Sequence, residues 1–203
     1  MSKCSINNNK LKIVKTTFNK IKQELSKTEE EELYTKIYDK LTSTFPHIKL
    51  NKIEEKERVI GEAVGTLINY VENASLDTLP IAYTYVYINI LQHTTFVKNI
   101  INKYKKLYHL DDDKAKEKIV TEVSDIYIKL VKNNGFNDIN KINFFIKLWD
   151  KIKEYIYKAI GKEYISKIKL YTEVNILANK MYNGTNKEAI TLKPKKGFKV
   201  IDP

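Results

Sequence analysis

Residues 142–159 read INFFIKLWDKIKEYIYKA, and this stretch carries the clearest helical pattern in the chain. Apolar residues recur in it at intervals of 3, 4, 3, 4 and 3. These residues, which form an apolar stripe, are Ile142, Phe145, Trp149, Ile152, Ile156 and Ala159. Intervals of three and four place side chains on one face of an α-helix. We therefore expect a helix over 142–159 that ends at Gly161, with Trp149 buried at the centre of its apolar face.

The same pattern extends outward along most of the chain. Seven further stretches place apolar residues at helical spacing or in a long apolar run, and each is predicted to be a helix. They cover about 10–27, 28–45, 53–71, 81–91, 95–107, 111–135 and 162–182. The stretch 81–91, IAYTYVYINIL, is ambiguous, because β-branched and aromatic residues also suit a strand. Its length and its lack of flanking turn residues favour a helix.

Several helix ends are marked by particular residues. Thr28 and Glu31 have the spacing of a capping box, which predicts a helix start. The acidic run 111–113 supplies an N-cap and negative charge for a first turn. Pro46 and the pair Asn134-Gly135 are typical of helix ends.

These patterns together predict the fold class. The chain has 203 residues with six glycines and four prolines, which is few enough for long helices. We expect an all-α protein with one helical-bundle-like domain of six to eight helices over 1–184, of which 1–9 is a flexible end. Residues 185–203 are expected to form a basic C-terminal β-hairpin or extended arm.

Charge is the strongest functional signal. The net charge is +11, and it comes from 35 lysines and one arginine, Arg58. Arginine is suited to reading guanine edges, whereas lysine acts as a mobile point charge. The balance predicts a sequence-tolerant attraction to polyanions. Coding bias in an A+T-rich genome would produce the same excess of lysine.

Two clusters interleave lysine with tyrosine, at 103–109 and 151–158. Lysine neutralises phosphates and tyrosine stacks on unpaired bases, so both clusters are candidate nucleic-acid contacts. Tyrosines at helical spacing also line core edges, and lysines commonly solvate a helix face. Together with lysines near both termini, the candidate nucleic-acid-binding residues are Lys12, Lys15, Lys22, Lys103, Tyr104, Lys105, Lys106, Lys151, Lys153, Tyr155, Lys158, Lys195, Lys196 and Lys199.

Catalytic signatures are missing from the sequence. There is no Walker A, GxGxxG or GxSxG motif, and the three histidines are isolated from one another. The single cysteine, Cys4, excludes the common zinc patterns. We expect no enzymatic activity, no cofactor and no metal. A metal site formed by carboxylates scattered in the sequence, such as Glu62, Asp125 and Asp150, remains an alternative.

Two functions fit these observations. The first is non-enzymatic nucleic-acid binding, as a structural or accessory subunit of a nucleoprotein or viral assembly. The second is a helical protein-interaction module, in which Trp149, Ile152 and Ile156 fill the groove of a partner protein or pair with a second copy. We expect an intracellular, cytoplasmic protein or a component of a viral particle, with no membrane span, because the longest uncharged stretch (78–97) contains several polar residues.

Overall fold

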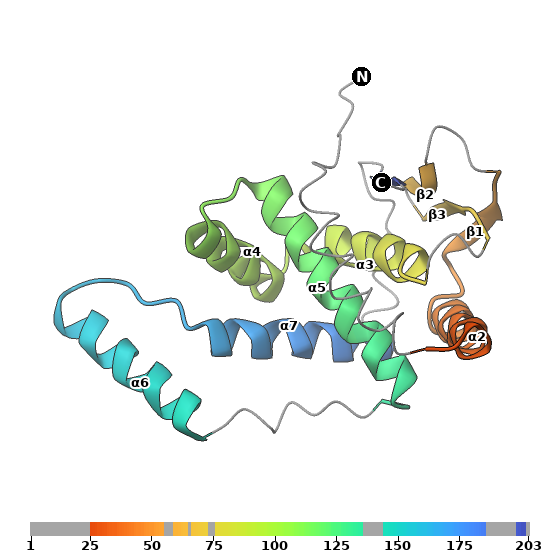
Figure 1. Cartoon of the computed structure of the whole chain (residues 1–203). Helices are drawn as coiled ribbons and strands as arrows, with labels where there is room; N and C mark the ends of the chain where they lie inside the picture. Colours follow the sequence, from red (N-terminus) through yellow and green to blue (C-terminus); the bar gives the residue numbers. More distant parts are fainter. Residues whose placement is uncertain are drawn as a thin grey trace.

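The computed structural model describes residues 25–54, 59–64, 66–72, 76–135, 144–185 and 198–201 (Figure 1). In this part the chain is mostly helical. Its helices are α2 (Lys27–Thr44), α3 (Thr78–Leu91), α4 (Thr95–Tyr108), α5 (Asp112–Lys132), α6 (Phe144–Ala159) and α7 (Lys167–Tyr182). Its strands are β1 (Lys49–Lys52), β2 (Val59–Val64), β3 (Leu67–Tyr70) and β4 (Phe198–Ile201). The helix predicted over 10–27 falls outside the described residues as far as position 24.

Helix α5 forms the centre of the core and packs against α2, α3, α4 and α7 (Figure 1). Its start is fixed by Asp111, whose carboxylate accepts a hydrogen bond from the Lys114 amide at 2.8 Å. Its end is followed by Asn134 and Gly135, which both have positive φ. Both ends confirm the sequence-based prediction. The apolar face is fully used, since Ile119, Val123 and Leu130 are buried.

Helix α3 confirms the helical interpretation of 81–91. It lies between α5 and strands β2, β3 and β4, so both of its sides are covered. Tyr83 and Tyr87 are buried, and each ring lies 6.0 Å from the ring of Phe45. Burial on all sides explains why the apolar residues of this stretch show no clear helical period.

The helix predicted over 53–71 is wrong, because β2 and β3 occupy most of this stretch. The strand order is β1-β3-β2-β4, with β1 parallel to β3 and β2 antiparallel to both β3 and β4. The burial alternates: Ile68 and Tyr70 are buried, whereas Leu67 is exposed and Asn69 partly so. Alternation with a period of two is the mark of a strand. The predicted helical character is thus confirmed for most of the described residues, which in addition contain one small sheet that was not predicted.

The C-terminal strand β4 pairs with β2 at the edge of this sheet. This places part of the predicted tail (185–203) in a strand, as expected. The other strand of the predicted hairpin, near 189–192, lies outside the described residues.

The starts of α2, α3 and α7 differ from the sequence-based prediction, and α3 begins at Thr78, three residues earlier than expected. The capping box of α2 is formed by Ser26 and Glu29: the Glu29 carboxylate accepts a 2.8 Å hydrogen bond from the Ser26 amide. The predicted box of Thr28 and Glu31 has the same spacing, shifted by two residues. Helix α7 begins at Lys167, five residues later than expected, because Ser166 is its N-cap. Among the described residues, no helix is both long and apolar enough to cross a membrane.

Candidate interaction surface on α6

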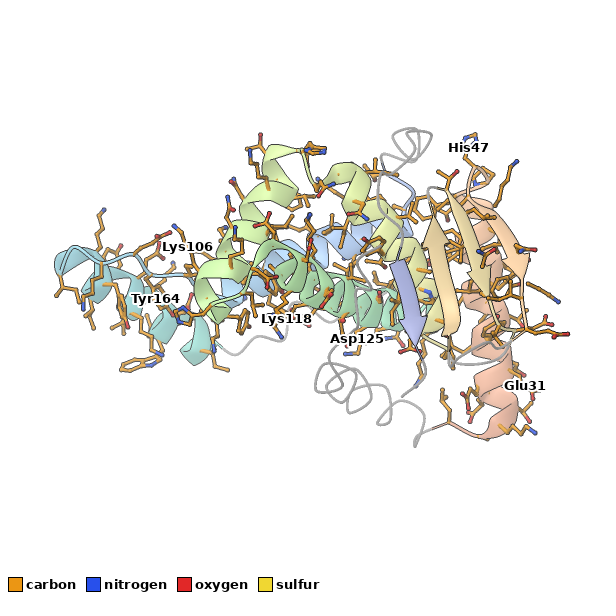
Figure 2. All side chains as sticks on the ribbon, turned by 90° about the horizontal axis from the view of Figure 1, so that it is seen from above. Glu31, His47, Lys106, Lys118, Asp125 and Tyr164 are labelled. Atoms are coloured by element: carbon orange, nitrogen blue, oxygen red, sulfur yellow. The ribbon has the colours of Figure 1, made fainter. Side chains whose placement is uncertain are left out.

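Helix α6 lies at the opposite end of the molecule from the sheet, beside the packed helices rather than among them (Figures 1 and 2). The largest apolar side chains that the structure describes on this helix face solvent. Trp149 is 59% exposed, Ile156 is 52% exposed and Tyr155 is 74% exposed. The prediction that Trp149 is buried is therefore wrong. The helix itself is confirmed, and Gly161, with positive φ, follows its end.

Apolar residues on one side of α6, together with one residue just after its end, form an exposed surface, which we call the outer face. It consists of Leu148, Trp149, Ile152, Ile156 and Ile160. An open hollow of about 430 Å³ lies against it, and the described residues that line this hollow are Ile146, Leu148, Trp149 and Ile152. Contiguous exposed apolar surface on a folded protein commonly marks an interaction site.

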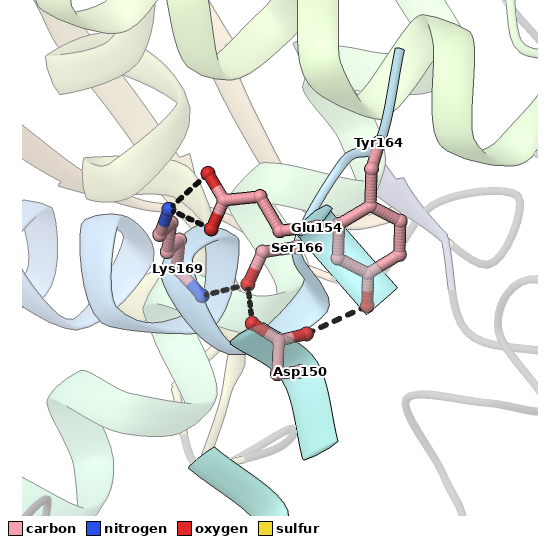
Figure 3. Close-up of polar contacts among 5 residues, drawn as sticks. All are labelled: Asp150, Glu154, Tyr164, Ser166 and Lys169. Atoms are coloured by element: carbon pink, nitrogen blue, oxygen red, sulfur yellow. Dashed lines mark hydrogen bonds and ion pairs between the residues drawn. The ribbon is translucent and has the colours of Figure 1, made fainter. Parts of the chain in front are cut away.

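Polar contacts hold the other side of α6 in place (Figure 3). Asp150 accepts hydrogen bonds from the hydroxyl of Tyr164, at 2.7 Å, and from the hydroxyl of Ser166. The Lys169 ammonium donates to both carboxylate oxygens of Glu154, at 2.8 and 2.7 Å. Asp150 and Glu154 are four residues apart and therefore share one helix face.

The anchored face and the outer face are opposite sides of the same helix. Ile152 follows Asp150 by two residues and Ile156 follows Glu154 by two, which is a rotation of about 200° around the helix axis. Asp150 thus binds the segment that leads into α7, Glu154 binds the first turn of α7, and the outer face is turned away from both.

Ser166 connects this anchor to the start of α7. Its hydroxyl oxygen accepts a hydrogen bond from the Lys169 amide at 3.0 Å, and the same hydroxyl donates to Asp150. Burial and the hydrogen bond to the Asp150 carboxylate raise the pKa of Tyr164 to about 12. Tyr164 therefore stays protonated at neutral pH and remains a donor to Asp150.

The lysines of α6 lie on more than one side of the helix. Lys147, Lys151, Lys153 and Lys158 are exposed, and within the described residues none of them takes part in an ion pair. The Lys153 ammonium lies 5.9 Å from the centre of the Trp149 ring, within the range of a cation–π contact. Lys147, Lys151 and Lys158 lie roughly 160–200° from Trp149 around the helix axis, on the side of Asp150 and Glu154, so Lys153 is the one of these four lysines that lies beside the outer face.

The lysines of the other predicted cluster, on α4, are neutralised within the molecule. Lys103 pairs with Glu173 at 2.5 Å, Lys106 with Glu163 at 2.7 Å, and Lys105 with Asp112. These contacts leave the 103–106 cluster with little free charge for a polyanion.

Tyr104 occupies the core side of the same helix. It is 1% exposed, and its hydroxyl donates to Glu122 at 2.5 Å. Burial, with the nearby Glu122 carboxylate, raises the pKa of Tyr104. A buried ring offers no face to a base, so the stacking role predicted for Tyr104 is corrected to a role in the core.

The remaining predicted nucleic-acid contacts are divided between α6 and the undescribed parts of the chain. Lys151, Lys153, Tyr155 and Lys158 lie together on α6, all exposed. Outside the described residues lie Lys12, Lys15, Lys22, Lys195 and Lys196. Lys199 is part of β4, but its side chain is not among those described.

Sequence reasoning missed the residues that anchor α6. Asp150 and Glu154 are the two carboxylates within α6, and their spacing of four places them opposite the apolar stripe. That signal was present in the sequence, but Tyr164 and Ser166 carry no comparable pattern. In the described part of the chain, no group of three or more His, Cys, Asp or Glu side chains is arranged to hold a metal ion.

No protein-family model, curated protein or solved structure matches this chain. Roles for its residues therefore rest on their geometry.

Proposed function

We propose that this protein is a helical protein-interaction module whose docking surface is the outer face of α6. The observation that carries the proposal is the orientation of α6: its carboxylates are bound to the rest of the chain, and its Trp149 stripe faces solvent. Trp and Tyr are the most frequent anchors of protein interfaces. An amphipathic helix that offers its apolar side is a common element of helix-in-groove recognition.

The exposure of Trp149 costs stability unless a partner covers it. Burying an aromatic side chain of this size is one of the larger apolar gains in a fold. Trp149 on α6 lacks this stabilisation because it is exposed, whereas the apolar stripes of α4 and α7 are buried. Binding of a partner supplies the missing burial.

The test compares two sets of serine substitutions in the full-length protein. Trp149→Ser, Ile152→Ser and Ile156→Ser together remove the outer face, and Tyr171→Ser with Ile176→Ser removes exposed apolar side chains of α7 as the control. We expect both variants to keep the melting temperature of the wild type within a few degrees, because all five side chains are exposed. Proteins that co-purify from the native source should be lost with the α6 variant and kept with the α7 variant. Retention of the same proteins by both variants would contradict the proposal.

A second candidate function is sequence-tolerant nucleic-acid binding, as part of a nucleoprotein or viral assembly. The observation in its favour is that Lys151, Lys153 and Lys158 are exposed and, within the described residues, unpaired, with Tyr155 beside them. Titration of mixed-sequence DNA and RNA at several salt concentrations tests it. Binding would weaken steeply with salt, by about 0.9 in the log–log slope for each duplex phosphate neutralised. Absence of binding at low salt rejects this candidate.

A further inference from the structure

We propose that a row of lysines with one tyrosine on α6 binds single-stranded nucleic acid, through its phosphates and one unpaired base. The row, which we call the basic row, consists of Lys147, Lys151, Tyr155 and Lys158. This inference goes beyond the protein-docking function, because the lysines stand on another side of α6 than the outer face, and it rests on the second candidate function. Three features of the row carry it: its alignment along the helix, its unpaired charge and the exposure of Tyr155.

The basic row follows the axis of α6. Lys147, Lys151 and Tyr155 follow one another at intervals of four, and each interval is a rise of about 6 Å and a rotation of about 40°. Lys158 comes about 4.5 Å after Tyr155 and lies within about 20° of the other two lysines. The lysines lie away from the outer face, and Tyr155 lies at the border between them and it. The row extends over about 16 Å, which matches about five nucleotides of a stacked strand.

The lysines of the row have no ion-pair partner among the described residues, although a carboxylate stands at the right spacing. Glu154 precedes Lys158 by four residues, which is the favourable order for a pair within a helix. Both oxygens of Glu154 instead accept hydrogen bonds from Lys169 on α7. Asp150, the other acidic residue of α6, accepts hydrogen bonds from two hydroxyl groups. Three lysines against one carboxylate without a cationic partner in the described residues leave this side of α6 positively charged.

Repulsion within the row favours binding of an anion. Lys147 and Lys151 are four residues apart, and like charges at this spacing destabilise a helix. The lysines of α4 provide the contrast, since Lys103, Lys105 and Lys106 each pair with a carboxylate of this chain. A polyanion along the basic row supplies the counter-charge that the chain itself supplies on α4.

Tyr155 favours a single strand over other polyanions. Its side chain is 74% exposed, which is the largest exposed fraction among the large hydrophobic side chains described. Along the axis it stands between Lys151 and Lys158, so its ring lies between two groups that bind phosphate. An unpaired base offers a free face for stacking on such a ring. A base within a duplex is covered by its neighbours, and an acidic peptide or a lipid headgroup has no base.

The experiment measures the fluorescence anisotropy of a labelled mixed-sequence oligonucleotide, single-stranded and as a duplex, with the full-length protein at several salt concentrations. The row variant carries Lys147→Gln, Lys151→Gln and Lys158→Gln. The control variant has the same net charge and replaces exposed lysines elsewhere on the surface, with Lys36→Gln, Lys98→Gln and Lys153→Gln. Both variants should keep the melting temperature of the wild type within a few degrees, because all six side chains are exposed.

We expect the row variant to bind the single strand at least tenfold more weakly than the wild type at low salt. Its log–log salt slope should be smaller by about 2, because three phosphate contacts to a single strand are lost. The control variant should bind like the wild type. Tyr155→Ala should weaken binding of the single strand at least fivefold and leave the duplex unchanged. Tyr171→Ala, at an exposed tyrosine of α7, should change neither affinity.

Each other outcome overturns the inference. Equal losses in the row and control variants would show that net charge attracts the strand, which leaves the second candidate function standing. Equal effects of Tyr155→Ala on the single strand and the duplex would exclude a stacked base. Polyglutamate bound as tightly as the single strand, and lost with the row variant, would identify an acidic protein as the partner. Absence of binding at low salt would also reject the second candidate function, whereas the docking function of the outer face is decided separately by the co-purification test.

Discussion

Helices α4 and α6 have similar sequences and opposite surroundings. Both combine an apolar stripe with lysines and tyrosines, and both were predicted on the same grounds. In α4 the stripe is buried and the lysines of the 103–106 cluster are paired with carboxylates. In α6 the stripe is exposed and the lysines are unpaired within the described residues. An amphipathic pattern thus specifies a helix, but it does not specify what covers the helix.

The largest expected difference between the two helices is in the cost of truncating an apolar side chain. Ile100→Ala on α4 should lower the free energy of unfolding by about 2–5 kcal/mol, because Ile100 is fully buried. Ile156→Ala on α6 should change it by less than about 0.5 kcal/mol, because Ile156 is exposed. Urea unfolding of both variants measures this. A comparable loss in the two variants would mean that α6 is packed against the core.

The anchor of α6 gives the next largest effect. Asp150→Ala removes the acceptor for the Tyr164 and Ser166 hydroxyls, and a hydrogen bond to a charged group contributes about 1.5–3 kcal/mol. Amide hydrogen exchange in α6 should therefore become faster, while exchange in α4 and α5 stays the same. Asp39→Ala, at an exposed carboxylate of α2, is the control. Unchanged exchange in α6 would show that Asp150 does not hold it.

A smaller effect is expected from Asp125 on α5, which Figure 2 labels. Burial raises the pKa of Asp125 to about 7, Lys129 lowers it, and Asp77 and Glu122 raise it further. The folded state therefore holds this proton more tightly than the unfolded chain. The contribution of Asp125 to stability is largest below pH 4 and is lost as the pH rises to about 7.

The substitution Asp125→Asn tests this pH dependence of stability, and the emission of Trp149 on α6 serves as an internal control. Asp125→Asn should raise the melting temperature at pH 8 by a few degrees, since each kcal/mol shifts it by about 2–4 °C in a domain of this size. At pH 4 the Asp125→Asn variant and the wild type should have the same melting temperature. The emission of Trp149 in the folded protein should be the same in both, because Asp125 lies away from α6. A lower melting temperature of Asp125→Asn at pH 8 would reverse the assigned sign.

Most helices could be predicted because their signals are local. The N-caps Thr94 and Asp111 and the pair Asn134-Gly135 act within a few residues, and each marks an element end in the structure. The stretch 59–70 was misread because Ile60, Val64 and Leu67 happen to fall at helical spacing. Its strand character comes from pairing with β1 and with the distant β4, which no local pattern reveals.

The candidate surface on α6 could be predicted only in part, because its helical stripe is a local signal and its exposure is not. The stripe of Trp149, Ile152 and Ile156 was identified as a candidate partner surface, but Trp149 was expected to be buried. Burial depends on the direction in which a helix docks, and here Asp150 and Glu154 set that direction through residues beyond the end of the helix. The pairing of Lys103 and Lys106 with Glu173 and Glu163 is equally non-local.

The outer face of α6 is open to solvent while the helix is folded and anchored. The emission of Trp149, the single tryptophan, tests it most directly. In dilute wild-type protein, we predict an emission maximum near that of the urea-unfolded chain, and quenching by acrylamide close to that of the unfolded chain. A blue-shifted emission that acrylamide quenches only after unfolding would place Trp149 in the core and contradict an open outer face.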